Sequence, residues 1–211
     1  MIPLCRWKII SLNPNPNINK NSIKDDLELA EIESEQELPL EILEKRRKGQ
    51  LRTGYTTGTS ASAATKAALL TLISSKIFNT IDVFLPKGKI ATLPIAWTRT
   101  NQDNQSVTCA VIKDGGDDPD VTHGAEICST VSLTDKKGLI EIDGGIGVGR
   151  VTRPGLGLEI GSAAINPVPK KMIEYTVFNS AKSLLSQNGF KVIISVPKGG
   201  ELAKKTDNPR L

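Results

Sequence analysis

The sequence predicts an α+β fold in which a mixed or largely antiparallel sheet packs against helices. Three observations lead to this class. Short runs of alternating apolar and polar residues recur along the middle of the chain, joined mostly by short connectors that contain Gly, Pro or Asp; this pattern is typical of β-hairpins. An Ala-rich segment precedes these runs and an amphipathic segment follows them. Because strands and helices do not alternate regularly, repeated βαβ units are not expected.

Six segments have the residue pattern of strands. In chain order they are residues 81–85, 89–97, 106–113, 126–133, 138–142 and 190–196. The last is predicted to be a buried strand close to the end of the sequence. Such a strand normally has a neighbour on each side, and an uncovered apolar edge favours association. We therefore expect the chain alone to be oligomeric or poorly soluble.

The first helix is predicted over residues 61–72. This segment is rich in Ala and Leu, which are strong helix formers. Either Thr59 or Ser60 can cap it, because a hydroxyl oxygen can accept a hydrogen bond from an N–H group of the first turn. The sequence therefore predicts a Gly- and Thr-rich turn that leads into the start of a buried helix.

The second helix is predicted over residues 167–187, where apolar residues recur at helical spacing. Asn166 is its expected cap, Pro167 occupies the first turn, and Gly189 is its expected stop. One or two further helical turns are expected over residues 201–206.

The beginning of the chain has a different composition. Residues 1–37 contain the run NPNPN and then many acidic residues, with few large apolar side chains. Such a segment offers little apolar area for burial, so we predict a mobile leader. Residues 38–211 are predicted to be the folded part.

Composition argues against several functional classes. Lys and Arg total 27 against 23 Asp and Glu, and the basic residues are scattered along the chain, so nucleic-acid binding is not expected. No apolar run approaches the ~20 residues of a membrane-spanning helix, and we expect a cytoplasmic protein without membrane contact. The three cysteines form no CxxC pair and are expected to be reduced packing residues. They are Cys5, Cys109 and Cys128.

Residues 54–59 (GYTTGT) form the turn before the first predicted helix. Glycines let the backbone approach a ligand, and N–H groups and hydroxyls at a helix start can receive an anion. The segment does not match the P-loop pattern, because no Lys follows Gly58. An ordinary capped turn also explains these residues, so both interpretations stay open.

Residues 113–124 (KDGGDDPDVTHG) gather four carboxylates, the only histidine and a lysine in one segment. This density of charge is costly unless the charges face a ligand, a cation or water. A metal site built from these side chains is disfavoured by Pro119 and by the lack of EF-hand spacing. We therefore predict no protein-bound metal, and a polar loop without chemistry is the alternative.

Two further segments are less specific on their own. Residues 143–155 (DGGIGVGRVTRPG) alternate glycine with other residues and contain two arginines. They lie late in a β-rich region, so a dinucleotide fingerprint is not expected, and close backbone packing is the alternative. Residues 163–171 (AAINPVPKK) have the pattern of a helix entry.

Together these segments resemble the cobalt-precorrin-5B C-1-methyltransferase family in wording and order. The resemblance covers about residues 51–211. One departure is Ser60, where family members commonly have Cys, so a thiol role is not expected there. The residues that carry the resemblance are 51–59 (LRTGYTTGT), 117–125 (DDPDVTHGA), 144–154 (GGIGVGRVTRP) and 164–169 (AINPVP).

The resemblance implies an enzyme that transfers a methyl group from S-adenosyl-L-methionine to C-1 of cobalt-precorrin-5B. The product would be cobalt-precorrin-6A, an intermediate of cobalamin (corrin) biosynthesis. Cobalt would arrive inside the corrinoid substrate, so the lack of a zinc or iron ligand pattern is no objection. A sulfonium methyl is already activated, so the protein mainly supplies alignment.

The resemblance and the motifs together suggest three sets of site residues. Residues that hold the cofactor's polar groups or accept a proton are expected to be Asp117, Asp118, Asp120 and His123. The cofactor-binding turn is expected to use Gly54, Thr56, Thr57, Gly58 and Thr59. The carboxylates of the substrate are expected to meet Lys113, Gly145, Gly147, Arg150, Arg153 and Asn166.

The family's fold continues beyond the match into a second Gly-rich half, so this chain is expected to be the N-terminal part of an incomplete version of that fold. Either a separate polypeptide supplies the C-terminal part, or the chain is a truncated product that is not expected to be active alone. A second hypothesis is a non-catalytic tetrapyrrole-binding module or a subunit of a split enzyme. A third hypothesis, which holds only if the resemblance is fortuitous, is an enzyme that binds a phosphate ligand at the Gly-Thr turn.

Overall fold

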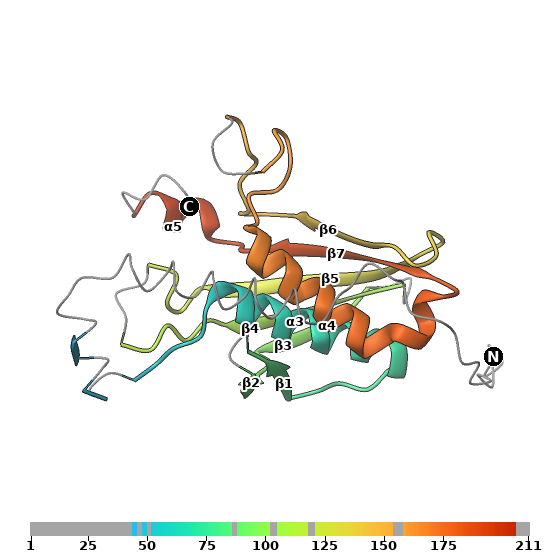
Figure 1. Ribbon diagram of the computed structural model, residues 1–211, viewed down its shortest axis with the longest axis horizontal. Coiled ribbons are helices and arrows are strands. Elements are labelled where there is room, and N and C mark those ends of the chain that lie inside the picture. Colours follow the sequence, from blue (N-terminus) through green and yellow to red (C-terminus); the bar gives the residue numbers. More distant parts are fainter. Residues whose placement is uncertain are drawn as a thin grey trace.

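The computed structural model describes residues 44–45, 48–49, 52–85, 88–101, 105–117, 121–153 and 158–205. The predicted leader at 1–37, which includes Cys5, lies outside these residues and stays a prediction. Within the described part, strands and helices form two sheets and one helical layer (Figure 1). The predicted α+β class is confirmed.

The main sheet has five strands in the order β3-β4-β5-β7-β6. All neighbouring strands are antiparallel except β6 and β7, which are parallel. The sheet is therefore mixed, as predicted. The strands are β3 (Trp97–Thr100), β4 (Ser106–Ile112), β5 (Glu126–Thr134), β6 (Ile140–Gly144) and β7 (Gly189–Ser195).

A separate two-stranded sheet pairs β1 (Thr80–Phe84) with β2 (Ile90–Pro94) in antiparallel register. The single strand expected over residues 89–97 is therefore wrong, because the chain divides there between two sheets. The N–H of Ala96 already donates to the carbonyl of Ala110 in the main sheet. The N–H of Ile95 still donates to the carbonyl of Asn79 at 2.8 Å, so the chain changes sheets between Ile95 and Ala96.

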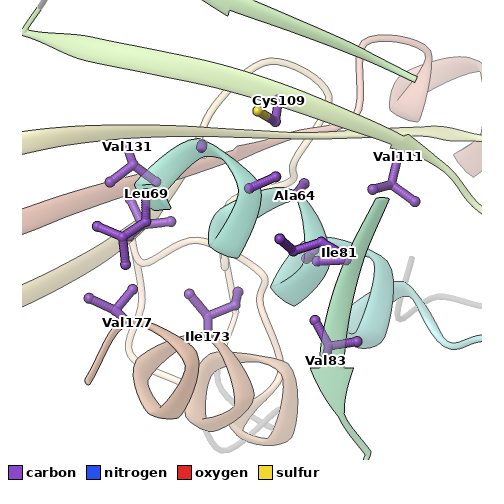
Figure 2. Close-up of a cluster of buried hydrophobic side chains, with 14 of the residues drawn as sticks. Ala64, Leu69, Ile81, Val83, Cys109, Val111, Val131, Ile173 and Val177 are labelled. Atoms are coloured by element: carbon purple, nitrogen blue, oxygen red, sulfur yellow. The ribbon is translucent and has the colours of Figure 1, made fainter. Parts of the chain in front are cut away.

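The helix α3 (Thr57–Ser74) packs on one face of the main sheet, against β4 and β5. The helix α4 (Pro167–Leu185) packs against α3 and also contacts β6 and β7 (Figure 1). Figure 2 shows the resulting core, in which α3 lies between the strands that carry Val111 and Val131 and the helix that carries Ile173 and Val177. The helix α3 is therefore the central element of the core.

The helix α3 begins earlier than the sequence predicted. Its N-cap is Thr56, whose hydroxyl oxygen accepts a hydrogen bond from the N–H of Thr59 at 3.1 Å. The predicted caps, Thr59 and Ser60, lie inside the helix and are buried. Several neighbouring residues in this turn can cap the helix. Because Thr56 is the cap, Gly58 lies in the first turn of the helix.

Both ends of α4 also differ from the prediction. Asn166 is the N-cap residue, but its side chain makes no capping hydrogen bond, and Pro167 holds the first helical position as expected. The helix ends at Leu185, and Gly189 begins β7 instead of stopping the helix. Ala181 has non-helical backbone angles (φ −133°, ψ 24°), so the last turn is displaced from the helix axis.

The strand β7 lies between β5 and β6, so its backbone is paired on both sides within this chain. The sequence suggested that this strand would have an uncovered edge, and that prediction is therefore wrong. Beyond it, the short helix α5 (Gly199–Ala203) lies close to the predicted helical turn. The free thiols of Cys109 and Cys128 are buried in β4 and β5, which confirms their predicted packing role.

Candidate functional site

A pocket of about 250 Å³ lies where the first turns of α3 and α4 meet the end of β7 and the start of α5. Most of its wall is apolar and comes from residues such as Ala61, Ile127 and Ile173. Six glycines and polar residues of the four motifs also line it. They are Thr57, Gly58, Thr122, Gly147, Gly149 and Asn166. Residues far apart in the sequence therefore meet in one cavity.

The first turn of α3 contributes backbone N–H groups to this end of the molecule. The N–H of Thr59 donates to the Thr56 hydroxyl and that of Ser60 to the Thr56 carbonyl. Thr57 and Gly58 are the first two helical residues, whose N–H groups have no acceptor within the helix. The partial positive charge of a helix N-terminus favours an electronegative group beside them.

Gly58 lies close to α4 at the pocket. A Cβ atom built on it would lie 3.2 Å from Cγ of Pro169, the third residue of α4. This distance is tighter than ordinary van der Waals contact. A larger residue at position 58 would therefore push the helices apart or fill the pocket that they form.

The Gly-rich segment after β6 forms another part of the wall. Gly147 has φ +76°, and a Cβ atom on it would lie 1.7 Å from the carbonyl oxygen of Val196. A Cβ atom on Gly145 would lie 2.4 Å from the Ser195 hydroxyl. Gly145 allows close packing against the end of β7, and Gly147 allows it against Val196 and Gly199 just after that strand. Close packing was the alternative interpretation of these glycines, but Gly147 also lines the pocket.

Arg150 is held by its own chain. Its guanidinium donates to both carboxylate oxygens of Asp143, at 2.5 and 3.0 Å, and to the carbonyl of Gly144 at 2.9 Å. The ion pair lowers the pKa of Asp143 and raises that of Arg150. The predicted substrate-binding arginines, Arg150 and Arg153, do not line the pocket.

The segment before α3 pairs with the acidic loop between β4 and β5. The guanidinium of Arg52 donates to both carboxylate oxygens of Asp114, and the N–H of Tyr55 donates to its carbonyl at 2.7 Å. A Cβ atom on Gly54 would lie 1.9 Å from the carbonyl carbon of Gly115. Gly54 is therefore a packing residue outside the pocket. The ion pair between Arg52 and Asp114 was not predicted from the sequence.

His123 belongs to the same loop. Its Nδ1 accepts a hydrogen bond from the N–H of Gly115 at 3.0 Å. In the neutral ring the proton must then sit on Nε2, so the outer nitrogen is a donor and not a proton acceptor. The carboxylate of Asp117 accepts the N–H of Arg52 at 2.7 Å. Asp118 and Asp120 lie outside the described residues.

Two further expectations concern Lys113 and metal binding. The Lys113 side chain is only 1% exposed, so it does not face the pocket opening as a substrate cation would. Within the described ranges, no group of three His, Cys, Asp or Glu side chains is placed to hold a metal ion. In the same ranges, no helix is long and apolar enough to cross a membrane.

The predicted cofactor turn is divided by this geometry. Thr57 and Gly58 line the pocket, whereas the hydroxyls of Thr56 and Thr59 hydrogen-bond to each other at 3.0 Å. Of the predicted substrate residues, Gly147 and Asn166 reach the same pocket. The pairing of Arg52 with Asp114 was not predicted. Its only signal in the sequence was the opposite charge of these two residues, which belong to different motifs.

Comparisons with known proteins agree with these motifs. The family model described as CbiD matches residues 44–211. A protein of Geobacillus kaustophilus named cobalt-precorrin-5B C(1)-methyltransferase is 52% identical over 164 residues, 78% of this chain and 43% of that protein. A protein of Picrophilus torridus with the same name is 47% identical over 160 residues, 76% of this chain and 46% of that protein.

A crystal structure of the cobalamin biosynthesis protein CbiD from Archaeoglobus fulgidus is also similar. It has a TM-score of 0.51 and 28% identity, and the match covers 75% of this chain and 48% of that one. The chain therefore spans less than half the length of the relatives that it matches.

Proposed function

This chain belongs to the CbiD family, and from this we propose that it takes part in the methylation of C-1 of cobalt-precorrin-5B to cobalt-precorrin-6A. S-adenosyl-L-methionine is the proposed methyl donor and cobalamin biosynthesis the proposed pathway. The observation that supports a site in this chain is the pocket, which joins Gly58, Gly147 and Asn166 from three separate motifs. We also propose that the reaction takes place in the cytoplasm.

The residues present fit the donor at two points. The apolar wall around Ala61, Ile127 and Ile173 suits an adenine ring. The N–H groups of Thr57 and Gly58 suit an electronegative group of the donor. At about 250 Å³ the pocket lies just below the usual range for small-molecule sites, ~300–1,000 Å³. It therefore fits a donor or part of it, and the macrocycle would lie across the opening.

When bound, the donor supplies an activated methyl group that a nucleophilic carbon can attack. The protein residues then have to align two molecules and exclude water. Gly58 and Gly147 keep the pocket open between its walls, and Asn166 offers an amide at its lining. We propose that Arg153, which is exposed, and the Arg150–Asp143 pair meet substrate carboxylates outside the pocket.

A second candidate function is that of a tetrapyrrole-binding module or one subunit of a split enzyme. The observation that favours it is the pocket lining, which among the described residues contains no carboxylate, imidazole or thiol that could act on a bound substrate. In that case a partner polypeptide supplies the rest of the catalytic fold. Both candidates use the same pocket, but only the first requires methyl transfer.

Binding of S-adenosylmethionine to the chain, measured by isothermal titration calorimetry, tests the donor site first. Methyl transfer from labelled S-adenosylmethionine to cobalt-precorrin-5B is then measured with the chain alone and with a polypeptide that carries the C-terminal half of a relative. We expect activity only in the mixture. Full turnover by the chain alone would contradict the need for a partner, and no binding under any condition would contradict the donor site.

A further inference from the structure

The ion pair between Arg52 and Asp114 joins two segments that each lead to residues lining the pocket. The guanidinium of Arg52 contacts both oxygens of the carboxylate, at 2.5 and 2.9 Å. The same carboxylate accepts the N–H of Gly116 at 2.9 Å, and the carbonyl of Asp114 accepts the N–H of Tyr55. Asp114 therefore fixes the chain immediately before Thr56, the cap of α3.

A second set of contacts carries this link across the loop to Thr122. The N–H of Gly115 donates to His123, and the N–H of Gly124 donates to the carbonyl of Lys113 at 2.8 Å. These hydrogen bonds hold His123 and Gly124, at the end of the loop, against its first residues, which include Asp114. Thr122 precedes His123 and lines the same pocket as Gly58 of α3.

The exposure of the pair argues against a mainly stabilising role. The side chains of Arg52 and Asp114 are 60% and 41% exposed, and ion pairs this accessible contribute little to folding stability. A two-pronged contact nevertheless fixes direction as well as distance, because both nitrogens of the planar guanidinium must meet both oxygens. Such a contact is suited to setting the separation of two segments.

We propose that the Arg52–Asp114 ion pair is a positioning device that sets the width of the pocket between the first turn of α3 and Thr122. Neither side chain lines the pocket, so both act through the backbone that they hold. This positioning role of the ion pair does not depend on the identity of the ligand. Its effect on S-adenosylmethionine rests on the function proposed above.

The test compares Arg52→Ala and Arg52→Lys with the unchanged chain. Lysine keeps the positive charge but loses the two-pronged contact. The matched control is Lys136→Ala, which removes a similarly exposed ion pair with Glu141 (2.6 Å) that does not touch the pocket. Backbone amide resonances of Gly58 and Thr122, the melting temperature and the dissociation constant for S-adenosylmethionine are measured on each.

We expect Arg52→Ala to shift both amide resonances and to weaken S-adenosylmethionine binding at least tenfold, while the melting temperature stays close to that of the unchanged chain. Arg52→Lys should restore only part of the affinity, and Lys136→Ala should change neither resonance. Methylguanidinium at millimolar concentration should return the Arg52→Ala resonances toward their original positions, because it can replace the missing group. Methylammonium should not.

Unchanged resonances of Gly58 and Thr122 in Arg52→Ala would overturn the proposal. It would also be overturned by a large loss of melting temperature that methylguanidinium does not reverse, since that is the behaviour of a purely structural residue. The unchanged chain could fail to bind S-adenosylmethionine while the resonances still move and recover as expected. In that case the positioning role of the Arg52–Asp114 ion pair stands and the proposed donor site is contradicted.

Discussion

The middle of α3 and its first turn perform different tasks with different residues. In the middle, small and apolar side chains are removed from water between the sheet and α4 (Figure 2). The first turn instead faces a pocket, and its surroundings are held by glycine contacts and by the Arg52–Asp114 ion pair. The fully buried apolar residues in the middle are Ala63, Ala64, Ala67, Ala68 and Leu69.

This difference separates stability from ligand binding within one helix. Apolar burial is the main source of folding free energy, and it depends on volume more than on direction. The pocket requires defined separations between backbone segments, which glycines and a planar ion pair provide. Substitutions in the core should therefore change the free energy of unfolding most, and those near the first turn should change binding most.

The largest expected effect on stability is that of Phe190→Ala in β7. Phe190 is fully buried, and its loss leaves a cavity that should lower the free energy of unfolding by about 3–5 kcal/mol. Its cross-strand partner Leu133 is 45% exposed. Leu133→Ala should therefore lower the free energy of unfolding by less than about 1 kcal/mol. Urea unfolding checks both, and equal losses would contradict the description of the core.

An intermediate effect is expected for Gly54→Ala. The new Cβ atom would lie 1.9 Å from the carbonyl carbon of Gly115, so the two segments must separate, at a cost of about 1–3 kcal/mol. The separation should also weaken ligand binding at the pocket. Gly200→Ala is the control, because no atom lies within 4 Å of its Cβ position, and its free energy of unfolding should change by no more than about 1 kcal/mol.

A small effect of pH is expected at Asp114. Its hydrogen bonds with Arg52, and a further one from the N–H of Gly116, lower its pKa to about 2. Because the folded-state pKa is depressed, the contribution to stability is complete above the ordinary value of about 4 and is lost as the pH falls through 2. The melting-temperature difference between the unchanged chain and Asp114→Asn should thus close between about pH 4 and pH 2. A difference that persists below pH 2 would contradict this assignment.

The sequence predicted the elements well where periodicity determined them. The strands β4, β5 and β7 and the helix α4 lie close to their predicted ranges, because alternating or helical burial leaves a direct pattern in the residues. The start of α3 was misplaced, because several adjacent threonines and serines can cap a helix. The single strand over residues 89–97 was wrong, because a change of sheet leaves no periodic signal.

The pocket was less predictable than the fold. The motifs named Gly58, Gly147 and Asn166, but their meeting in one cavity depends on how α3, α4 and the end of β7 pack. The pairing of Arg150 with Asp143 was likewise invisible, since a charged residue in a motif has the same pattern whether it binds a ligand or a neighbour. Contacts between distant segments are set by the tertiary structure alone.

We propose that the pocket beside Gly58 belongs to a methyl-transfer site. Its most direct test is transfer of label from S-adenosylmethionine to cobalt-precorrin-5B by this chain together with the C-terminal half of a relative, comparing Gly58→Val with the unchanged chain. Because a valine side chain would enter the space between Gly58 and Pro169, we predict that labelled product is lost while the urea unfolding midpoint is largely kept. Transfer by Gly58→Val at the unchanged rate would contradict the account.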